Sequence, residues 1–151
     1  MKNIELFQVN KYPLTNGIRL IEASAGTGKT FSLSHLVLRL LTEKEYSINE
    51  ILVVSFTEAT ASELKAKIIE RLISALKIIE SINSNVKPSK IDNVLNEWVE
   101  LNITSKEKGL YIASLLLEAL ERIDTADITT IHGFCSKTLH REAIELSLIH
   151  I

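Results

Sequence analysis

A glycine-rich turn near the start of the chain carries residue types that bind phosphate. Gly26 and Gly28 let the backbone wrap around phosphate groups and aim its N–H groups at them, at the positive end of the helix that follows. Lys29 would reach the β- and γ-phosphates, and the Thr30 hydroxyl would bind Mg²⁺. The turn therefore predicts a P-loop for the Mg²⁺ complex of a nucleoside triphosphate, and we expect ATP. Its nucleotide-binding residues would be Ala23, Ser24, Ala25, Gly26, Thr27, Gly28, Lys29 and Thr30.

The first position of this turn departs from the strict P-loop pattern, because Ala23 stands where glycine is usual. The surrounding sequence supports the assignment. The apolar run 18–21 precedes the turn and reads as a strand, and apolar residues recur at helical spacing from Lys29 onward. The alternative is a turn between a strand and a helix that is rich in glycine by chance.

ATP hydrolysis needs more than a P-loop. The Mg²⁺ ion also needs an acidic residue at the end of a second apolar strand, and a group that orients the attacking water. The sequence has no run of four apolar residues that leads into such an acid. Asp124 follows Ile123, but Glu121 and Arg122 interrupt that run. No Asn-Lys-x-Asp motif is present, which argues against a GTPase. We therefore expect no complete set of catalytic residues, and no ATP hydrolysis by the chain alone.

A second group of candidate residues follows the apolar run 51–54, which is typical of a buried parallel strand. Phe56 and Thr57 stand where this strand would give way to a helix. In an open α/β sheet that edge faces ligands. Phe56 could stack on a base, and Thr57 together with the helix N-terminus could hold a phosphate. On the residues alone an alternative stays open, in which Phe56 is a core residue and Thr57 is a helix cap.

A third group lies at residues 129–135, where another strand would meet a helix. Thr130 and His132 bring a hydroxyl and an imidazole to this junction, although a lone histidine there could also serve as a cap or a core group. We expect Cys135 to be a small buried residue, since no basic group is arranged to activate it. The other histidines lack the spacing of metal ligands to one another or to the cysteine, so no metal site of side chains is predicted: His35, His140 and His150.

The elements that would position these residues follow from the apolar spacing. Residues 1–82 read as strand, helix, strand and helix, which is the opening of a parallel α/β sheet. The second helix has an apolar stripe of about five turns between residues 64 and 79. Ser55 and Glu58 have the spacing of a capping box for that helix. The basic side chains on it are expected to form a solvated face: Lys65, Lys67 and Arg71.

Residues 83–124 differ from the preceding part and read as a helical insertion. Pro88 ends any helix, and two amphipathic stretches follow at 91–101 and 106–122. Residues 125–151 read as a return to the sheet, with a strand at 127–131 and a helix at 134–144. The chain then ends in apolar residues without a closing turn, and we expect it to be a truncated piece.

The composition limits the possible functions only weakly. The net charge is −2, with acidic and basic residues mixed, so no basic block argues for nucleic acid. Cys135 is the one cysteine, which excludes an internal disulfide and suits a reducing compartment. The chain has no signal segment and no apolar run long enough to span a bilayer. We therefore expect a soluble, cytoplasmic protein without a membrane partner.

The three groups, taken in order, resemble motifs of superfamily 1 DNA helicases. Residues 20–30 resemble motif I, in which alanine can open the P-loop, and residues 53–64 resemble motif Ia. Residues 130–135 resemble the Thr-x-His motif that follows. Within the superfamily these versions are most similar to the RecB family, the beta subunits of bacterial exodeoxyribonuclease V, and less similar to the UvrD and Rep branches.

This resemblance implies a partial RecA-like P-loop NTPase domain with a parallel sheet and a helical insertion. It implies that Lys29 and Thr30 serve ATP and Mg²⁺, and that the track of single-stranded DNA runs along Phe56, Thr57, Thr130 and His132. The parent would be an ATP-dependent DNA helicase and exonuclease in recombinational double-strand break repair. Its partners would be single- and double-stranded DNA and RecC-like and RecD-like subunits.

Members of this family are many times longer than the present sequence. They continue with an Asp-Glu motif, a second RecA-like domain and a nuclease domain, none of which is found in these 151 residues. Two alternatives therefore stay open. The chain could be the nucleotide-binding module of a P-loop protein that is not a helicase, or a gene fragment with no independent activity.

Overall fold

The computed structural model describes residues 7–23, 26, 28–84 and 92–149, with residues 83 and 145–149 described by their backbone alone. The elements in these ranges follow one another as α1 (Lys29–Glu43), a 3₁₀ turn η1 (Ile48–Glu50), β1 (Leu52–Ser55), α2 (Glu58–Asn83), α3 (Asn93–Asn102), α4 (Lys106–Glu121), a second 3₁₀ turn η2 (Ile123–Thr125), β2 (Asp127–Thr130) and α5 (Ile131–Ile149).

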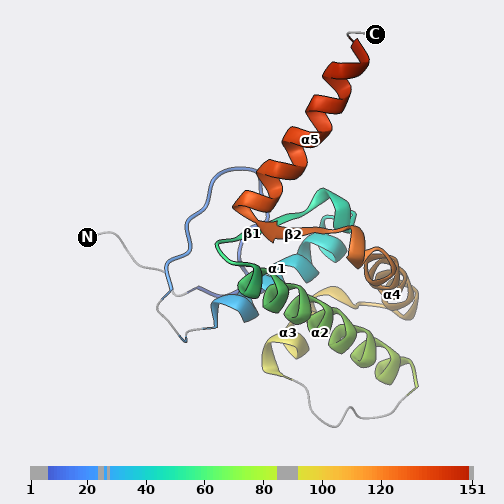
Figure 1. The fold of residues 1–151 in the computed structure, drawn as a ribbon. Coiled ribbons are helices and arrows are strands. Elements are labelled where there is room, and N and C mark those ends of the chain that lie inside the picture. Colours follow the sequence, from blue (N-terminus) through green and yellow to red (C-terminus); the bar gives the residue numbers. More distant parts are fainter. Residues whose placement is uncertain (1–6, 24–25, 27, 85–91, 150–151) are drawn as a thin grey trace.

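The two strands form a parallel pair in which Leu52 lies opposite Asp127 and Ser55 lies opposite Thr130. Parallel strands need a crossover connection, and the segment from α2 to η2 supplies it. Figure 1 shows α1, α2 and α4 on one side of this pair, while α5 leads away from the end of β2 on the other. The α/β class with a parallel sheet, predicted from the sequence, is thereby confirmed.

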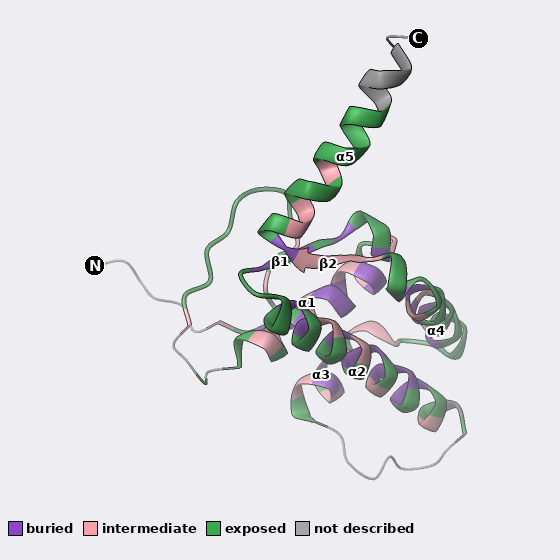
Figure 2. Ribbon diagram, viewed as in Figure 1, coloured by how far each residue is buried: buried purple, intermediate pink, exposed green. Residues whose placement is uncertain are grey.

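The strand β1 is covered on one face only (Figure 2). Val53 and Ser55 are buried against the helices, whereas Leu52 and Val54 are 45% and 40% exposed. The prediction of a strand buried on both faces is therefore wrong for these two residues. In the part of the chain that the structure describes, helices cover one side of the sheet, so alternate side chains of the strand remain open to solvent.

The predicted strand at residues 18–21 is not formed. This segment has irregular backbone, and Ile18 and Leu20 are almost fully exposed. An apolar run becomes a strand only where a neighbouring strand takes up its backbone N–H and C=O groups. Within the described ranges β1 and β2 pair with each other alone, so this segment has no strand beside it.

One hydrophobic core joins the predicted insertion to the first part of the chain. Leu38 of α1, Leu72 of α2 and Leu116 of α4 are fully buried in this core, and Trp98 brings α3 to it. The helices expected at 91–101 and 106–122 are confirmed as α3 and α4. The last strand and helix are confirmed as β2 and α5, although α5 already begins at Ile131, which was predicted to end the strand. The helices α3 and α4 therefore share their packing with the helix that follows the glycine-rich turn.

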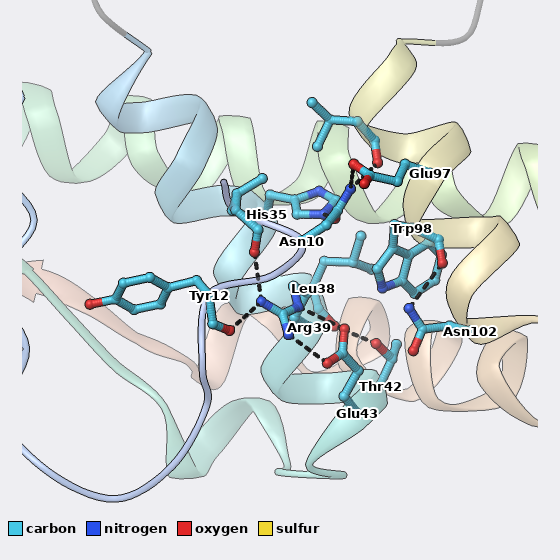
Figure 3. A network of polar contacts seen from close by, with 12 residues as sticks. Asn10, Tyr12, His35, Leu38, Arg39, Thr42, Glu43, Glu97, Trp98 and Asn102 are labelled. Carbon is cyan, nitrogen blue, oxygen red and sulfur yellow. Dashed lines mark hydrogen bonds and ion pairs between the residues drawn. The ribbon is translucent and has the colours of Figure 1, made fainter. Parts of the chain in front are cut away.

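Arg39 of α1 anchors the N-terminal segment to the core (Figure 3). One guanidinium nitrogen, Nη1, donates to the carbonyl oxygens of Val9 and Tyr12 at 2.6 and 2.7 Å. The Nε and Nη2 atoms donate to the two carboxylate oxygens of Glu43 at 2.7 and 2.8 Å. Because Arg39 is only 6% exposed, these bonds satisfy a charge that would otherwise be buried without a partner.

His35 continues this polar layer toward α3. Its Nε2 atom lies 2.6 Å from Oδ1 of Asn10, whose amide nitrogen donates to the Val94 carbonyl and the Glu97 carboxylate at 2.8 Å each. Burial, reinforced by the nearby positive charge of Arg71, lowers the pKa of His35 from 6.5 to about 3. The ring is therefore neutral at neutral pH, with Nε2–H as donor and Nδ1 as acceptor.

We predict that Arg39→Ala lowers the free energy of unfolding by about 3 kcal/mol, because it leaves Glu43 and two carbonyl groups without their donor. Arg122→Ala is a matched control, since Arg122 also pairs with a glutamate four residues away, at 3.3 Å, but on the surface. Its loss should stay below about 1 kcal/mol. Urea unfolding of both variants measures the difference. Equal losses would contradict the anchoring role of Arg39.

Candidate functional site

Gly26 and Gly28, the two described glycines of the glycine-rich turn, have a backbone conformation that favours glycine. Gly26 and Gly28 have φ angles of 78° and 82°, in the left-handed region that other residues rarely adopt. A Cβ atom built at Gly26 would meet nothing within 4 Å, and one at Gly28 would meet only Phe31, at 4.0 Å. Glycine is therefore required here by the backbone angle and not by lack of space.

The turn leads directly into α1, with Gly28 as the residue before the first turn of the helix. Lys29 and Thr30 are the first two residues of this helix. Because Lys29 is exposed and Thr30 is half-buried, the positive end of the helix is accessible. The first turn of α1 contains no acidic residue, so no carboxylate of this helix would compete with a phosphate there. These features fit a nucleotide phosphate group. Ala23 is half-buried, while Ser24, Ala25 and Thr27 lie outside the described residues.

Phe56 and Thr57 follow β1 at its carboxyl end. Phe56 is 90% exposed, which excludes the alternative of a core side chain. Thr57 is the N-cap of α2, since its hydroxyl accepts the N–H of Thr60 at 3.1 Å. The predicted capping box at Ser55 is wrong, because the Ser55 hydroxyl donates to the Thr57 carbonyl at 3.0 Å.

Thr130 ends β2 and is almost completely buried, at 4% exposure. Its hydroxyl donates to the carboxylate of Glu58 at 3.0 Å and accepts the N–H of Gly133 at 3.0 Å. A Cβ atom at Gly133 would lie 2.5 Å from the Thr129 hydroxyl, so only glycine allows the first turn of α5 to approach the strand this closely. Thr130 therefore has a structural role that the sequence did not indicate.

His132 and Cys135 are both exposed on the first turns of α5. The prediction of a buried cysteine is wrong, because this part of α5 projects from the sheet edge and is not packed into the core (Figure 2).

The pairing of Ser55 with Thr130 brings the two strand-to-helix junctions next to each other. Figure 1 shows the carboxyl ends of β1 and β2 and the first turn of α1 toward the same side of the molecule. The described residues of the three predicted groups thus lie toward the same side of the molecule, which is where ligand-binding segments of a parallel sheet are expected. The link from Glu58 to Thr130 spans 72 residues, and no local pattern in the sequence indicates it.

No helix in the described ranges is both long enough and apolar enough to cross a membrane. The same ranges contain no group of three or more His, Cys, Asp or Glu side chains arranged to hold a metal ion.

Known proteins are similar to this sequence over nearly its whole length. Residues 5–150 match the family described as the UvrD/REP helicase N-terminal domain. The chain is 37% identical over 148 residues to the RecBCD enzyme subunit RecB of Escherichia coli (strain K12), covering 88% of this chain and 11% of that protein. It is 39% identical over 138 residues to the RecB subunit of Haemophilus influenzae, covering 85% and 11%. It is 41% identical over 139 residues to that of Buchnera aphidicola subsp. Baizongia pistaciae, covering 87% and 11%.

The chain thus spans 11% of the length of each of these curated relatives. The matched range contains the glycine-rich turn and both strand-to-helix junctions, and it confirms the RecA-like class and the resemblance to the RecB family expected from the three motifs. The chain belongs to the family of UvrD/REP helicase N-terminal domains.

Proposed function

We propose that this chain is the ATP-binding segment of a RecB-like, ATP-dependent DNA helicase and exonuclease subunit that acts in recombinational double-strand break repair. The observation that carries the proposal is the turn before α1. Its two glycines hold left-handed φ angles, and Lys29 and Thr30 follow at an accessible helix N-terminus without an acidic neighbour in the first turn. This arrangement suits the phosphates of ATP.

Residues 23–30 would surround the phosphates with backbone N–H groups, Lys29 would contact the β- and γ-phosphates, and Thr30 would bind Mg²⁺. Bound Mg²⁺ would neutralise phosphate charge and orient the terminal phosphoryl group. The sequence offers no acidic residue at the end of an apolar strand to complete hydrolysis. We therefore propose that the chain alone binds ATP weakly and does not turn it over.

Single-stranded DNA would pass along the edge formed by the two junctions. The exposed ring of Phe56 can stack on a base, and His132 lies on the adjoining α5. Thr57 is exposed, although its hydroxyl already accepts the Thr60 N–H group. Thr130 is buried, so its contribution to this track would be to fix the neighbouring helix start through Gly133.

The partners of the full activity would be DNA and RecC-like and RecD-like subunits, in the cytoplasm. We further propose that residues 83–124 are an insertion into a core formed by residues 1–82 and 125–151. The competing function is nucleotide binding in a P-loop protein without a DNA role. Stimulation of ATP hydrolysis in the intact protein by single-stranded DNA separates the two functions.

Lys29→Ala should weaken binding of MgATP to this chain by about ten-fold or more, because a charge-assisted contact with phosphate is lost. Lys44→Ala is the matched control, since Lys44 caps the opposite end of the same helix. Titration with a fluorescent ATP analogue in the presence of Mg²⁺ measures both. If Lys29→Ala binds as tightly as the unchanged chain, the assignment of this turn is wrong.

Phe56→Ala should weaken binding of single-stranded DNA to the intact protein by about ten-fold to a hundred-fold, since one stacked base is worth about 1–3 kcal/mol. Because the ring is exposed, the melting temperature should hardly change. Tyr46→Ala, which removes an aromatic side chain that is 43% exposed outside the three predicted groups, is the control. Fluorescence anisotropy with a labelled oligonucleotide gives the affinities, and unchanged affinity in Phe56→Ala would exclude the stacking role.

A further inference from the structure

Arg71 lies in the middle of α2 and is only 6% exposed. The sequence-based expectation that it belongs to a solvated helix face is therefore wrong. The expectation does hold for two other basic residues of α2: Lys65 pairs with Asp124 and Lys67 pairs with Glu70, both near the surface. A guanidinium group is costly to bury unless hydrogen-bonding partners surround it, so its contacts show what it holds together.

The first set of contacts joins Arg71 to α1. Its Nε and Nη2 atoms lie 2.9 and 2.7 Å from Nδ1 of His35. The central carbon of the guanidinium lies 4.4 Å from the centre of the Phe31 ring, at a distance typical of a cation–π contact. Phe31 and His35 are one helical turn apart, so the guanidinium spans the first two turns of the helix that begins with Lys29 and Thr30.

The second set of contacts joins Arg71 to the start of α3. Nη1 forms a hydrogen-bonded ion pair with Oδ2 of Asp92, and Nη2 lies 3.4 Å from its Oδ1. The same Oδ1 accepts the N–H of Leu95 at 2.7 Å, which caps α3. Such a forked arrangement fixes the plane of the guanidinium group, which a single lysine charge could not do.

His35 completes the chain of bonds on the far side. Its Nδ1 atom accepts from Arg71, and its Nε2–H group donates to Asn10, which in turn donates to Val94 and Glu97 of α3. Figure 3 shows the side of this chain that runs from His35 through Asn10 to Glu97. Each donor in this network has an acceptor. The first two turns of α1 are therefore held by Arg71 on one side of His35 and by Asn10 on the other.

We infer that Arg71 is a positioning residue for the phosphate-binding turn, clamping the first two turns of α1 to α2 and, through Asp92, to α3. This inference rests on the proposed function, because it assigns support to the same nucleotide site. Arg71 lies on α2, whose N-cap is Thr57, the residue after Phe56. The contacts of Arg71 therefore also join α1 to the helix that begins next to Phe56. The insertion would thus control how firmly the ATP site is held.

The test uses Asp92→Asn, which keeps the capping oxygen for Leu95 but removes the charge that Arg71 needs. Arg71→Lys keeps the charge but loses the fork and the flat contact with Phe31. The control is Glu118→Gln, which removes the acid of an exposed arginine pair on α4. For each variant, hydrogen exchange is followed along the whole chain without nucleotide, and MgATP affinity is measured by titration.

In Asp92→Asn and Arg71→Lys we expect exchange of amides in the first two turns of α1 to rise about ten-fold, with amides in β1 and α4 unchanged. We also expect MgATP to bind about three-fold to ten-fold more weakly. Glu118→Gln should match the unchanged chain in both measurements. If Arg71→Lys does not fold, Asp92→Asn decides alone.

Unchanged exchange in α1, exchange that rises equally throughout the chain, or unchanged MgATP affinity would each overturn the inference. Failure of the proposed function gives a different result. In that case the unchanged chain itself does not bind MgATP, while the local rise of exchange in α1 of the variants still reports whether Arg71 clamps the helix.

Discussion

The buried polar face of α1 is the feature on which the arrangement of the chain depends. A helix in a small core would ordinarily present apolar residues, yet α1 buries His35 and Arg39 among Leu38, Leu41 and the core. Each polar side chain holds a different neighbour: Arg39 binds the carbonyl groups of Val9 and Tyr12, and His35 binds Asn10 and Arg71. A buried side chain without a hydrogen-bonding partner in these positions would lower the stability by several kcal/mol, which is about the size of a large mutational effect. The N-terminal segment, α2 and α3 must therefore lie where they supply partners to the polar side chains of α1.

This constraint bears on function because α1 starts at the glycine-rich turn. A phosphate site made of backbone N–H groups is only as well placed as the helix behind it, since small displacements weaken several hydrogen bonds at once. The sheet edge is held by a separate contact, the hydrogen bond from Thr130 to Glu58, which fixes the start of α5 relative to the start of α2. The proposed nucleotide and DNA segments thus rest on different polar contacts, and α2 takes part in both through Arg71 and Glu58.

The sequence predicts what is encoded locally and misses what depends on distant partners. The apolar stripe of α2 and the short run of β2 are confirmed, because spacing and residue type decide them. The strand expected at 18–21 fails, since a strand requires a neighbour that the described chain does not place there. Arg71 was misplaced for a similar reason: its position suits a solvated helix face, and its burial depends on Asp92, which lies 21 residues away. The sequence also did not decide that Phe56 is exposed and Thr130 is buried, because both depend on the directions in which α2 and α5 continue from the ends of the two strands.

The proposed function requires that the turn at the start of α1 bind the phosphates of ATP. A ¹H–¹⁵N NMR titration of the chain with MgATP tests it most directly, because it reports on each backbone N–H group separately. If the turn binds phosphate, we expect saturable shifts that are largest for Gly26, Gly28, Lys29 and Thr30, with smaller shifts along the first turns of α1. Shifts that are absent at MgATP concentrations up to several millimolar, or that centre on another part of the chain, would contradict it.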